Sequence, residues 1–254
     1  MSSGVFSTFL PGTKGKKTFF GLGTWNAHGL FCVSDFDKLC RKVKLAAKHA
    51  RKSTVFCLQE THGTEALLNK HFRRLLLDFW AFWSFGEKNN GGLIILVSKL
   101  AAPDRNFVVQ EVIFPGRAMK ITITNQHGIK FGNQIIYNVH NFALGSDGTR
   151  NLCRAIHKDI DDMHPNLLTN SLFLCGDFNI SHRERFSYVA PVNNSSDAAI
   201  TSSTSSLASP GYAQFSRVFA CLLEIDAKLP TRYDSASETA KALDRVFTNT
   251  PSAI

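Results

Sequence analysis

The chain has 254 residues, of which 29 are Lys or Arg and 20 are Asp or Glu, so its formal net charge is +9, and 44% of its residues are hydrophobic. This apolar content suffices for a large core and excludes a disordered chain, and no apolar run reaches the roughly 18 residues that a membrane helix needs. We therefore expect one folded, intracellular domain without a membrane partner, whose positive charge is compatible with a phosphate-bearing polyanion.

Short segments rich in β-branched and aromatic residues predict seven strands. In chain order they are residues 18–25, 54–59, 92–98, 118–124, 134–142, 171–178 and 243–249. Amphipathic patterns predict four helices that begin after Ser34, after Thr64, near Asp147 and near Tyr212. Because these helices interrupt the strands irregularly, we expect mixed sheets in a sandwich covered by helices, which is an α/β fold.

The chain divides into a tail, a domain and a loop. Residues 1–17 are predicted to be a flexible tail, residues 18–254 the folded domain, and residues 195–210, which are dense in Ser and Thr, a loop within it. The helix after Ser34 is rich in Lys and Arg. Its basic face is either a solvated outer surface or a surface that binds a polyanion, and the sequence leaves both interpretations open.

The segment SLFLCGDFNISH carries the clearest chemical signal. An apolar strand ends there, and Asp177 and Asn179 follow at a spacing of two, which places both side chains on one side of an extended backbone. A carboxylate that positions water and an amide that donates to a phosphoryl oxygen suit the hydrolysis of a phosphate ester. The alternative is an ordinary turn rich in Asx residues.

Three further polar residues stand at the ends of predicted strands. Glu60 follows an apolar run in VFCLQETH, and a carboxylate in this place can bind a hard cation such as Mg²⁺. Asn26 ends the first strand in GTWNAHGL, and His140 ends the strand in IIYNVHNF. Each residue alone is a weak signal, since capping, surface or structural roles are common for such side chains.

Together these residues give the chain its resemblance to a known family. The motifs that carry it are W-N-x-x-G-L, L-Q-E-T-H, Gly-Gly at 91–92, GRAMKI at 116–121, GDFN at 176–179 and LDRVF at 243–247. Their order resembles the endonuclease/exonuclease/phosphatase family over nearly the whole chain. Within it, the chain is most similar to the endonuclease domains of LINE-type (non-LTR) retrotransposons and to exonuclease III-like abasic-site endonucleases.

The resemblance implies a four-layer α/β sandwich of two mixed sheets and a role for each candidate residue. Glu60 would be the principal ligand of Mg²⁺ or Mn²⁺, and Asn26 would contact the metal or the phosphate. Asp177 would orient the attacking water, Asn179 would bind the scissile phosphate, and His140 would lie against that phosphate. Asp244 would be the carboxylate that orients the catalytic histidine.

The resemblance also predicts a function and a partner. The leading hypothesis is a Mg²⁺-dependent phosphodiesterase that nicks double-stranded DNA in the nucleus, with a reverse-transcriptase domain in the parent polyprotein. The family's downstream Ser-Asp-His and last strand are absent before Ile254. A second hypothesis is therefore a truncated, inactive nucleic-acid-binding remnant. A third is a phosphatase of phospholipids or phosphoinositides, which GRAMKI and LDRVF argue against.

Overall fold

The structure is a computed structural model that describes most residues between 20 and 179 and shorter parts elsewhere. The described residues are 6–9, 20–30, 33–50, 53–86, 91–124, 133–163, 170–179, 184–188, 200–204, 215, 222–225, 232–234, 239–241 and 244–249. Within them, no helix is long and apolar enough to cross a membrane.

The described strands form three sheets. Sheet A has the order β1 (Phe6–Phe9), β2 (Phe20–Asn26), β3 (Ser53–Gln59), β5 (Leu93–Ser98) and β4 (Phe79–Ser84). Sheet B has the order β12 (Leu223–Ile225), β15 (Asp244–Thr248), β9 (Ser171–Asp177), β8 (Gln134–His140), β7 (Ala118–Ile123) and β6 (Val108–Phe114). A small third sheet has the order β11 (Ile200–Thr204), β10 (Glu184–Tyr188), β14 (Thr239–Lys241) and β13 (Arg232–Asp234).

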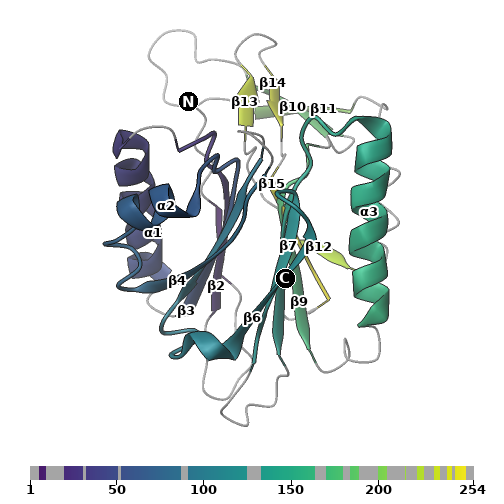
Figure 1. The fold of residues 1–254 in the computed structure, drawn as a ribbon. Helices are drawn as coiled ribbons and strands as arrows, with labels where there is room; N and C mark the ends of the chain where they lie inside the picture. Colours follow the sequence, from purple (N-terminus) through teal and green to yellow (C-terminus); the bar gives the residue numbers. More distant parts are fainter. Residues whose placement is uncertain are drawn as a thin grey trace, which may run out of the picture.

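The two large sheets lie face to face between helices. Figure 1 shows α1 (Val33–Ala50) and α2 (Glu65–His71) outside sheet A and α3 (Gly145–Asp162) outside sheet B. A 3₁₀ turn, Arg105–Phe107, precedes β6. Both sheets are mixed, since β2 and β3 are parallel, β8 and β9 are parallel, and their other pairs are antiparallel. The predicted four-layer α/β sandwich is confirmed.

Three apolar layers hold the sandwich together. The central layer between the sheets contains Leu22, Val55, Ile95, Met119 and Phe173, all nearly or fully buried. A second layer joins sheet A to α1 and α2, and a third joins sheet B to α3. Burial of such side chains stabilises the fold by roughly 1.5–3 kcal/mol each.

Each of the seven predicted strands corresponds to a strand of the structure, but eight described strands were not predicted. Two of them, β4 and β6, are the outermost strands at one edge of each large sheet. The other six are the short strands β1, β10, β11, β12, β13 and β14. The helix after Thr64 is shorter than expected, because the chain continues in turns in which Phe72 and Leu75 stay buried. Of the helix predicted near Tyr212, only Phe215 is described as helical.

Two predicted irregular segments contain described strands. Phe6–Phe9, in the predicted tail 1–17, forms β1 and pairs with β2. Ile200–Thr204, in the predicted loop 195–210, forms β11 and pairs with β10. The remainder of both segments lies outside the described residues.

A buried amide joins the two large sheets. The Asn138 side chain of β8 donates from Nδ2 to the carbonyl oxygens of Leu58 (2.9 Å) and Ile94 (3.0 Å) in sheet A. Its Oδ1 accepts a hydrogen bond of 2.7 Å from Gln59 Nε2. Asn138 and Gln59 are both fully buried. These bonds fix β8 against β3 and β5. Of the candidate site residues, Glu60 follows Gln59 directly and His140 follows Asn138 by two residues.

The Asn138→Leu variant is expected to lower the free energy of unfolding by about 2–4 kcal/mol, because buried hydrogen-bonding groups of sheet A lose their partner. Urea unfolding of both proteins measures this difference. The control variant Asn151→Leu changes an exposed residue of α3 and should stay within about 0.5 kcal/mol of the parent. Equal stability of the two variants would contradict the role of the bridge.

A second polar cluster attaches α3 to sheet B. Lys120 Nζ, which is almost fully buried, lies 2.9 Å and 3.0 Å from the two carboxylate oxygens of Asp159 and 3.2 Å from Glu111 Oε2. The Tyr137 hydroxyl donates to the same Asp159 carboxylate. Burial and this hydrogen bond raise the pKa of Tyr137 above its ordinary value.

The raised pKa predicts a loss of stability in alkali. Above the ordinary tyrosine pKa of about 10 the unfolded chain releases the Tyr137 proton while the folded chain keeps it, so the contribution of Tyr137 is complete below pH 10 and declines above it by about 1.4 kcal/mol per pH unit. Urea unfolding between pH 8 and 11 should therefore show a steeper decline for the parent than for Tyr137→Phe. Parallel profiles would contradict this account.

Candidate active site

The candidate residues meet where the carboxyl ends of four strands come together. β2 ends at Asn26, Glu60 follows β3 directly, β8 ends at His140 and β9 ends at Asp177. Because β2 runs parallel to β3 and β8 parallel to β9, each pair of ends lies at one edge of its sheet. Ligand atoms of Glu60, His140 and Asp177 lie within 4.8 Å of one another.

Hydrogen bonds fix the protonation pattern of His140. Arg117 NH1 lies 3.2 Å from His140 Nδ1, and His140 Nε2 lies 3.0 Å from Glu60 Oε1. A guanidinium can only donate, so Nδ1 accepts and the proton resides on Nε2, which donates to Glu60. His140 is fully buried, and this arrangement makes it a neutral donor at the floor of the site.

Asn26 and Asp177 connect the two sheets at the site. Asn26 Nδ2 donates to Asp177 Oδ2 at 2.8 Å, and Asn26 Oδ1 accepts from the backbone N–H of His28 at 2.9 Å. Asp177 Oδ1 accepts from the backbone N–H of Asn179 at 3.0 Å. Both oxygens of this buried carboxylate are thus held in fixed directions. The side-chain Nδ2 of Asn179 is buried and has no hydrogen-bond partner within the described parts of the chain.

The surroundings of Glu60 favour its charged form. Burial of the carboxylate raises its pKa, but hydrogen bonds from His140, His28 and Asn26 outweigh this effect, so the pKa of Glu60 lies well below its ordinary range. Burial lowers the pKa of Arg117, and the nearby Glu60 charge opposes that change. A carboxylate kept ionised beside Asp177 makes the site attractive to a cation.

Backbone strain is concentrated in the same place. His28, Glu60 and Asn179 have positive φ angles of 52°, 50° and 47°. Residues other than glycine pay about 1 kcal/mol or more for this conformation, which persists only where the surroundings impose it. The carbonyl of Glu60 accepts from the backbone N–H of Gly29 at 2.6 Å, and this bond holds the turn after β3 against the turn after β2.

The Gly91-Gly92 pair lets the backbone after Glu60 pack closely against the backbone before β5. Gly92 has a φ of +90°, and a Cβ atom there would lie 2.9 Å from Thr61 Oγ1. The backbone N–H of Thr61 donates to the Gly92 carbonyl and that of His62 to the Gly91 carbonyl. The motif at 91–92 therefore supports the backbone next to Glu60.

The backbone pairing places Asp244 beside the site. β15 runs antiparallel to β9, and Asp244 stands directly opposite Asp177 in the register. This is the position in which the sequence predicts a carboxylate near the catalytic residues. Its role toward a histidine stays a prediction.

The residues present fit a divalent cation. Mg²⁺ prefers oxygen ligands and commonly takes only one or two carboxylates from protein. Glu60 supplies one such oxygen ligand, and the nearby Asp177 carboxylate adds negative charge that attracts the cation. His140 is the third member of the cluster, but Arg117 occupies the lone pair of its Nδ1 and its Nε2 carries a proton. In this arrangement His140 is a hydrogen-bond donor and not a ligand.

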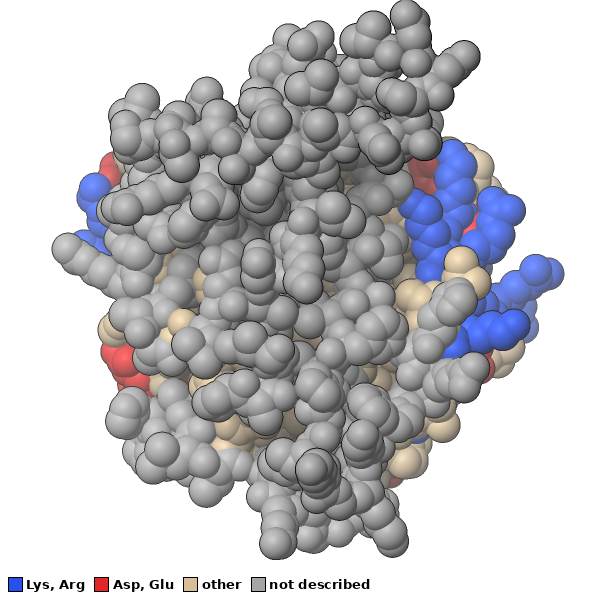
Figure 2. All heavy atoms as spheres, turned by 180° about the vertical axis from the view of Figure 1, so that it is seen from behind, with Lys and Arg blue, Asp and Glu red and all other residues tan. Residues whose placement is uncertain are grey.

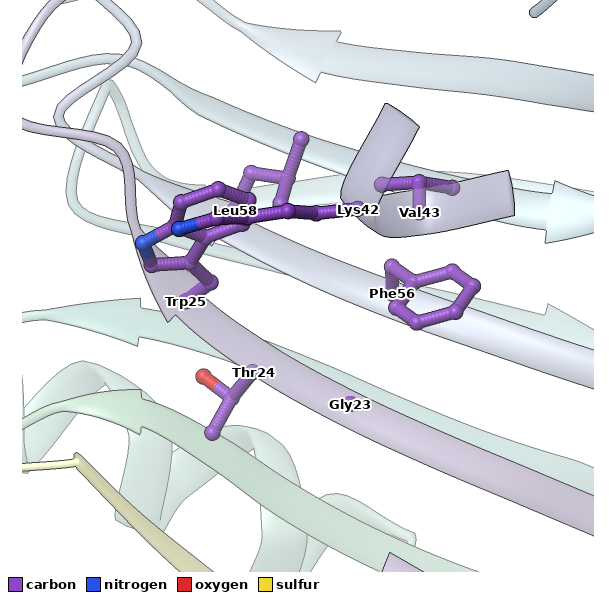
Figure 3. A pocket seen from close by; sticks show the side chains of 7 residues that line it. All are labelled: Gly23, Thr24, Trp25, Lys42, Val43, Phe56 and Leu58. Carbon is purple, nitrogen blue, oxygen red and sulfur yellow. The ribbon is translucent and has the colours of Figure 1, made fainter. Parts of the chain in front are cut away.

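A separate pocket lies between α1 and sheet A. Figure 3 shows its lining, with Lys42 of α1 beside Trp25 of β2. Lys42 Nζ lies 4.3 Å from the centre of the Trp25 ring, which is the geometry of a cation–π contact. Burial and the nearby Lys38 lower the pKa of Lys42. No carboxylate lines this pocket, so we do not assign the chemistry to it.

The structure brings five of the predicted residues together, namely Asn26, Glu60, His140, Asp177 and Asn179. The sixth, Asp244, stands opposite Asp177 in the strand register. Sequence reasoning missed Arg117 and His28 as site residues. The signal for Arg117 lies in the pairing of the predicted strands 118–124 and 134–142. In the structure β7 and β8 pair antiparallel with Ala118 opposite Val139, which puts Arg117 across from His140. The signal for His28 is its spacing of two from Asn26.

Comparison with known proteins identifies the chain's relatives. A model of the Endonuclease/Exonuclease/phosphatase family matches residues 23–253. No curated protein matches the chain.

Solved structures share the fold at low sequence identity. A humanized D. rerio TDP2 with 14 mutations is 12% identical, with a TM-score of 0.53 over 89% of this chain and 82% of that chain. The catalytic domain of Xenopus laevis APE2 is 15% identical, with a TM-score of 0.55 over 90% and 82%. TDP2 from C. elegans is 13% identical, with a TM-score of 0.54 over 91% and 64%. At this identity the likeness supports the fold alone.

Divalent cations should stabilise the protein through this site. At about ten times the Kd, Mg²⁺ or Mn²⁺ is expected to add about 1.4 kcal/mol, which raises the Tm by about 3–5 °C. Thermal unfolding with metal and with EDTA measures the shift. Glu60→Gln and Asp177→Asn should lose most of it, whereas the control Asp162→Asn, an exposed carboxylate of α3, should keep it. The same shift in all four proteins would place metal binding elsewhere.

Proposed function

The chain belongs to the Endonuclease/Exonuclease/phosphatase family, whose members hydrolyse phosphate esters with divalent metal ions, and we propose that it is a Mg²⁺-dependent phosphodiesterase that nicks the DNA backbone. One observation carries the proposal. Glu60 and Asp177 converge with the neutral donor His140, and Asn179, whose Nδ2 has no partner in the described part of the chain, follows Asp177 by two residues. This set combines a cation site, a fixed carboxylate and a free donor for a phosphoryl oxygen.

Each residue would have a separate task in the hydrolysis. Glu60 and Asn26 would hold the Mg²⁺ ion, which when bound neutralises charge that develops on the phosphate. Asp177, with both oxygens aligned by Asn26 and Asn179, would orient the attacking water and accept its proton. Because His28 donates to Asn26 Oδ1, the Asn26 amide must share or turn this oxygen to contact a metal.

Two donors would stabilise the charge on the reacting phosphate. Among the described residues the buried Asn179 Nδ2 has no hydrogen-bond partner, so a phosphoryl oxygen could accept from it without displacing a described contact. His140 Nε2–H would exchange its bond to Glu60 for one to the phosphate, while Arg117 keeps the ring in the same tautomer. Loss of one such donor typically costs about 100-fold or more in rate.

A basic surface supports DNA as the substrate. Exposed basic residues gather along α1 and around α2, namely Lys38, Arg41, Lys44, Lys48, Lys70, Arg73 and Arg74. Figure 2 shows Lys and Arg side chains collected on this side of the molecule. Two of them form only long pairs, Lys38 with Asp35 (3.9 Å) and Lys44 with Asp78 (3.8 Å), and such exposed pairs leave the positive potential largely available.

We extend the proposal to the biological setting. The motifs W-N-x-x-G-L, L-Q-E-T-H and GDFN, which carry the resemblance to LINE-type retrotransposon endonucleases, supply the site residues Asn26, Glu60, Asp177 and Asn179. A nick made by this domain in nuclear double-stranded DNA would expose a 3′-hydroxyl that primes a reverse-transcriptase domain of the same polyprotein.

Conversion of supercoiled plasmid to nicked circle tests the proposed activity. The 254-residue chain should nick the plasmid with Mg²⁺ and not with EDTA, and Glu60→Gln and Asp177→Asn should each lose about 100-fold or more. The control Asp162→Asn should retain full activity. Absence of Mg²⁺-dependent nicking by folded protein would reject the nuclease and favour a domain that only binds nucleic acid.

A further inference from the structure

An exposed aromatic ring lies parallel to the ring of His140. Phe142 follows His140 by two residues, and its ring lies parallel to the His140 ring, with the ring centres 5.9 Å apart and an angle of 9° between the planes. His140 is fully buried, whereas Phe142 remains 49% exposed. The Phe142 ring therefore lies beside the buried His140 ring, while about half of it is exposed and available to another ring.

The backbone around Phe142 is held firmly. The backbone N–H of Asn141 donates to the Asp177 carbonyl at 2.9 Å, and its Nδ2 donates to the Phe178 carbonyl at 2.9 Å. Thr149 Oγ1 of α3 donates to Asn141 Oδ1 at 3.0 Å. On the other side of Phe142, Ala143 has a φ of +55°, a costly conformation for a residue with a Cβ atom.

These contacts orient Phe142 before any substrate arrives. An aromatic side chain has few rotatable bonds, and a fixed backbone reduces the freedom it would lose on binding. An exposed phenylalanine also gains nothing from its contact with water. The location beside His140, which in turn donates to Glu60, ties this ring to the substrate of the site rather than to a remote surface.

We propose that Phe142 stacks against a nucleobase next to the scissile phosphate, so that the preferred substrate is DNA with an unpaired or unstacked base at the cut. This inference rests on the proposed function and specifies its substrate. A phosphate bound at His140 would bring its flanking bases near the Phe142 ring, whose centre lies 5.9 Å from that of the His140 ring. Every base has a π-face, so the contact favours base exposure and not a particular sequence.

An unpaired base is required by the geometry of stacking. In a continuous duplex both faces of each base are already covered by its neighbours, so a ring of the protein can stack only where that continuity is interrupted. Interrupted positions occur in single strands, at mismatches and at ends. The cost of unstacking is lowest at such positions, which makes them the preferred places of cleavage.

Binding of short DNA in EDTA tests the stacking contact without any cleavage. Fluorescence anisotropy compares a single-stranded oligonucleotide with one of equal length whose sugars lack all bases. Phe142→Ala should raise the Kd for the normal strand about 5-fold to 100-fold, the effect of losing one stacked base, and leave the Kd for the base-free strand unchanged. Phe142→Trp should keep the Kd for the normal strand near that of the parent, whereas Phe142→Leu should raise it as Phe142→Ala does.

Controls separate this inference from the proposed catalysis. Leu100→Ala, which removes another exposed apolar side chain, should bind both strands as the parent does. Equal weakening of both strands by Phe142→Ala, no weakening at all, or rescue by Leu would each overturn the stacking role. If Phe142→Ala weakens binding of the normal strand only, while the parent protein never nicks plasmid, the stacking contact is upheld and the nuclease is rejected. If the parent nicks plasmid but Phe142→Ala binds the normal strand as the parent does, the nuclease is upheld and the stacking contact is rejected.

Discussion

The site depends on the polar bridge between the two large sheets. Two sheets packed only through apolar side chains can slide, because the hydrophobic effect has no direction. The three hydrogen bonds of the Asn138 amide have direction, and they join β8 to β3 and β5. Since Glu60 is the next residue after Gln59 and His140 is two residues after Asn138, the same bonds set the distance between a carboxylate of one sheet and a histidine of the other.

Within the part of the chain that the structure describes, some polar atoms of the bridge lack a full set of hydrogen bonds, which indicates that the bridge determines how the sheets align more than how stable they are. Gln59 Oε1 is buried without a hydrogen-bond partner among the described residues, and Gln59 Nε2 faces three acceptors, Thr24 Oγ1, the Cys57 carbonyl and Asn138 Oδ1, with two hydrogens. Apolar side chains of similar volume would avoid the cost of about 1–3 kcal/mol for an unpaired group. The amides therefore contribute register and specificity, which apolar packing does not supply.

The sequence predicted the strands and their ends well because alternating or continuous apolar runs are local signals. Asn26, Glu60, His140 and Asp177 all follow such runs, and their convergence follows once β2 with β3 and β8 with β9 are parallel. The edge strands β4 and β6 were missed because β4 reads as an aromatic cluster and β6 is half exposed with an irregular register near Val112. The roles of Arg117 and Asn138 depend on neighbours distant in sequence, which no local pattern contains.

The hydrogen bonds that hold the two carboxylates of the site in place do not extend to every described donor beside them. Asp177 and Glu60 would repel each other, yet donors from Asn26, His28 and His140 keep both carboxylates in place. The backbones of His28, Glu60 and Asn179 have strained positive φ angles in this arrangement. The donors are distributed so that both carboxylates are hydrogen-bonded, whereas Asn179 Nδ2 has no partner among the residues that the structure describes. A fold selected for stability alone would pair that amide. An arrangement that leaves a donor free beside two oriented carboxylates is suited to receive an anion together with a cation, which is the combination that a phosphodiester and its metal present.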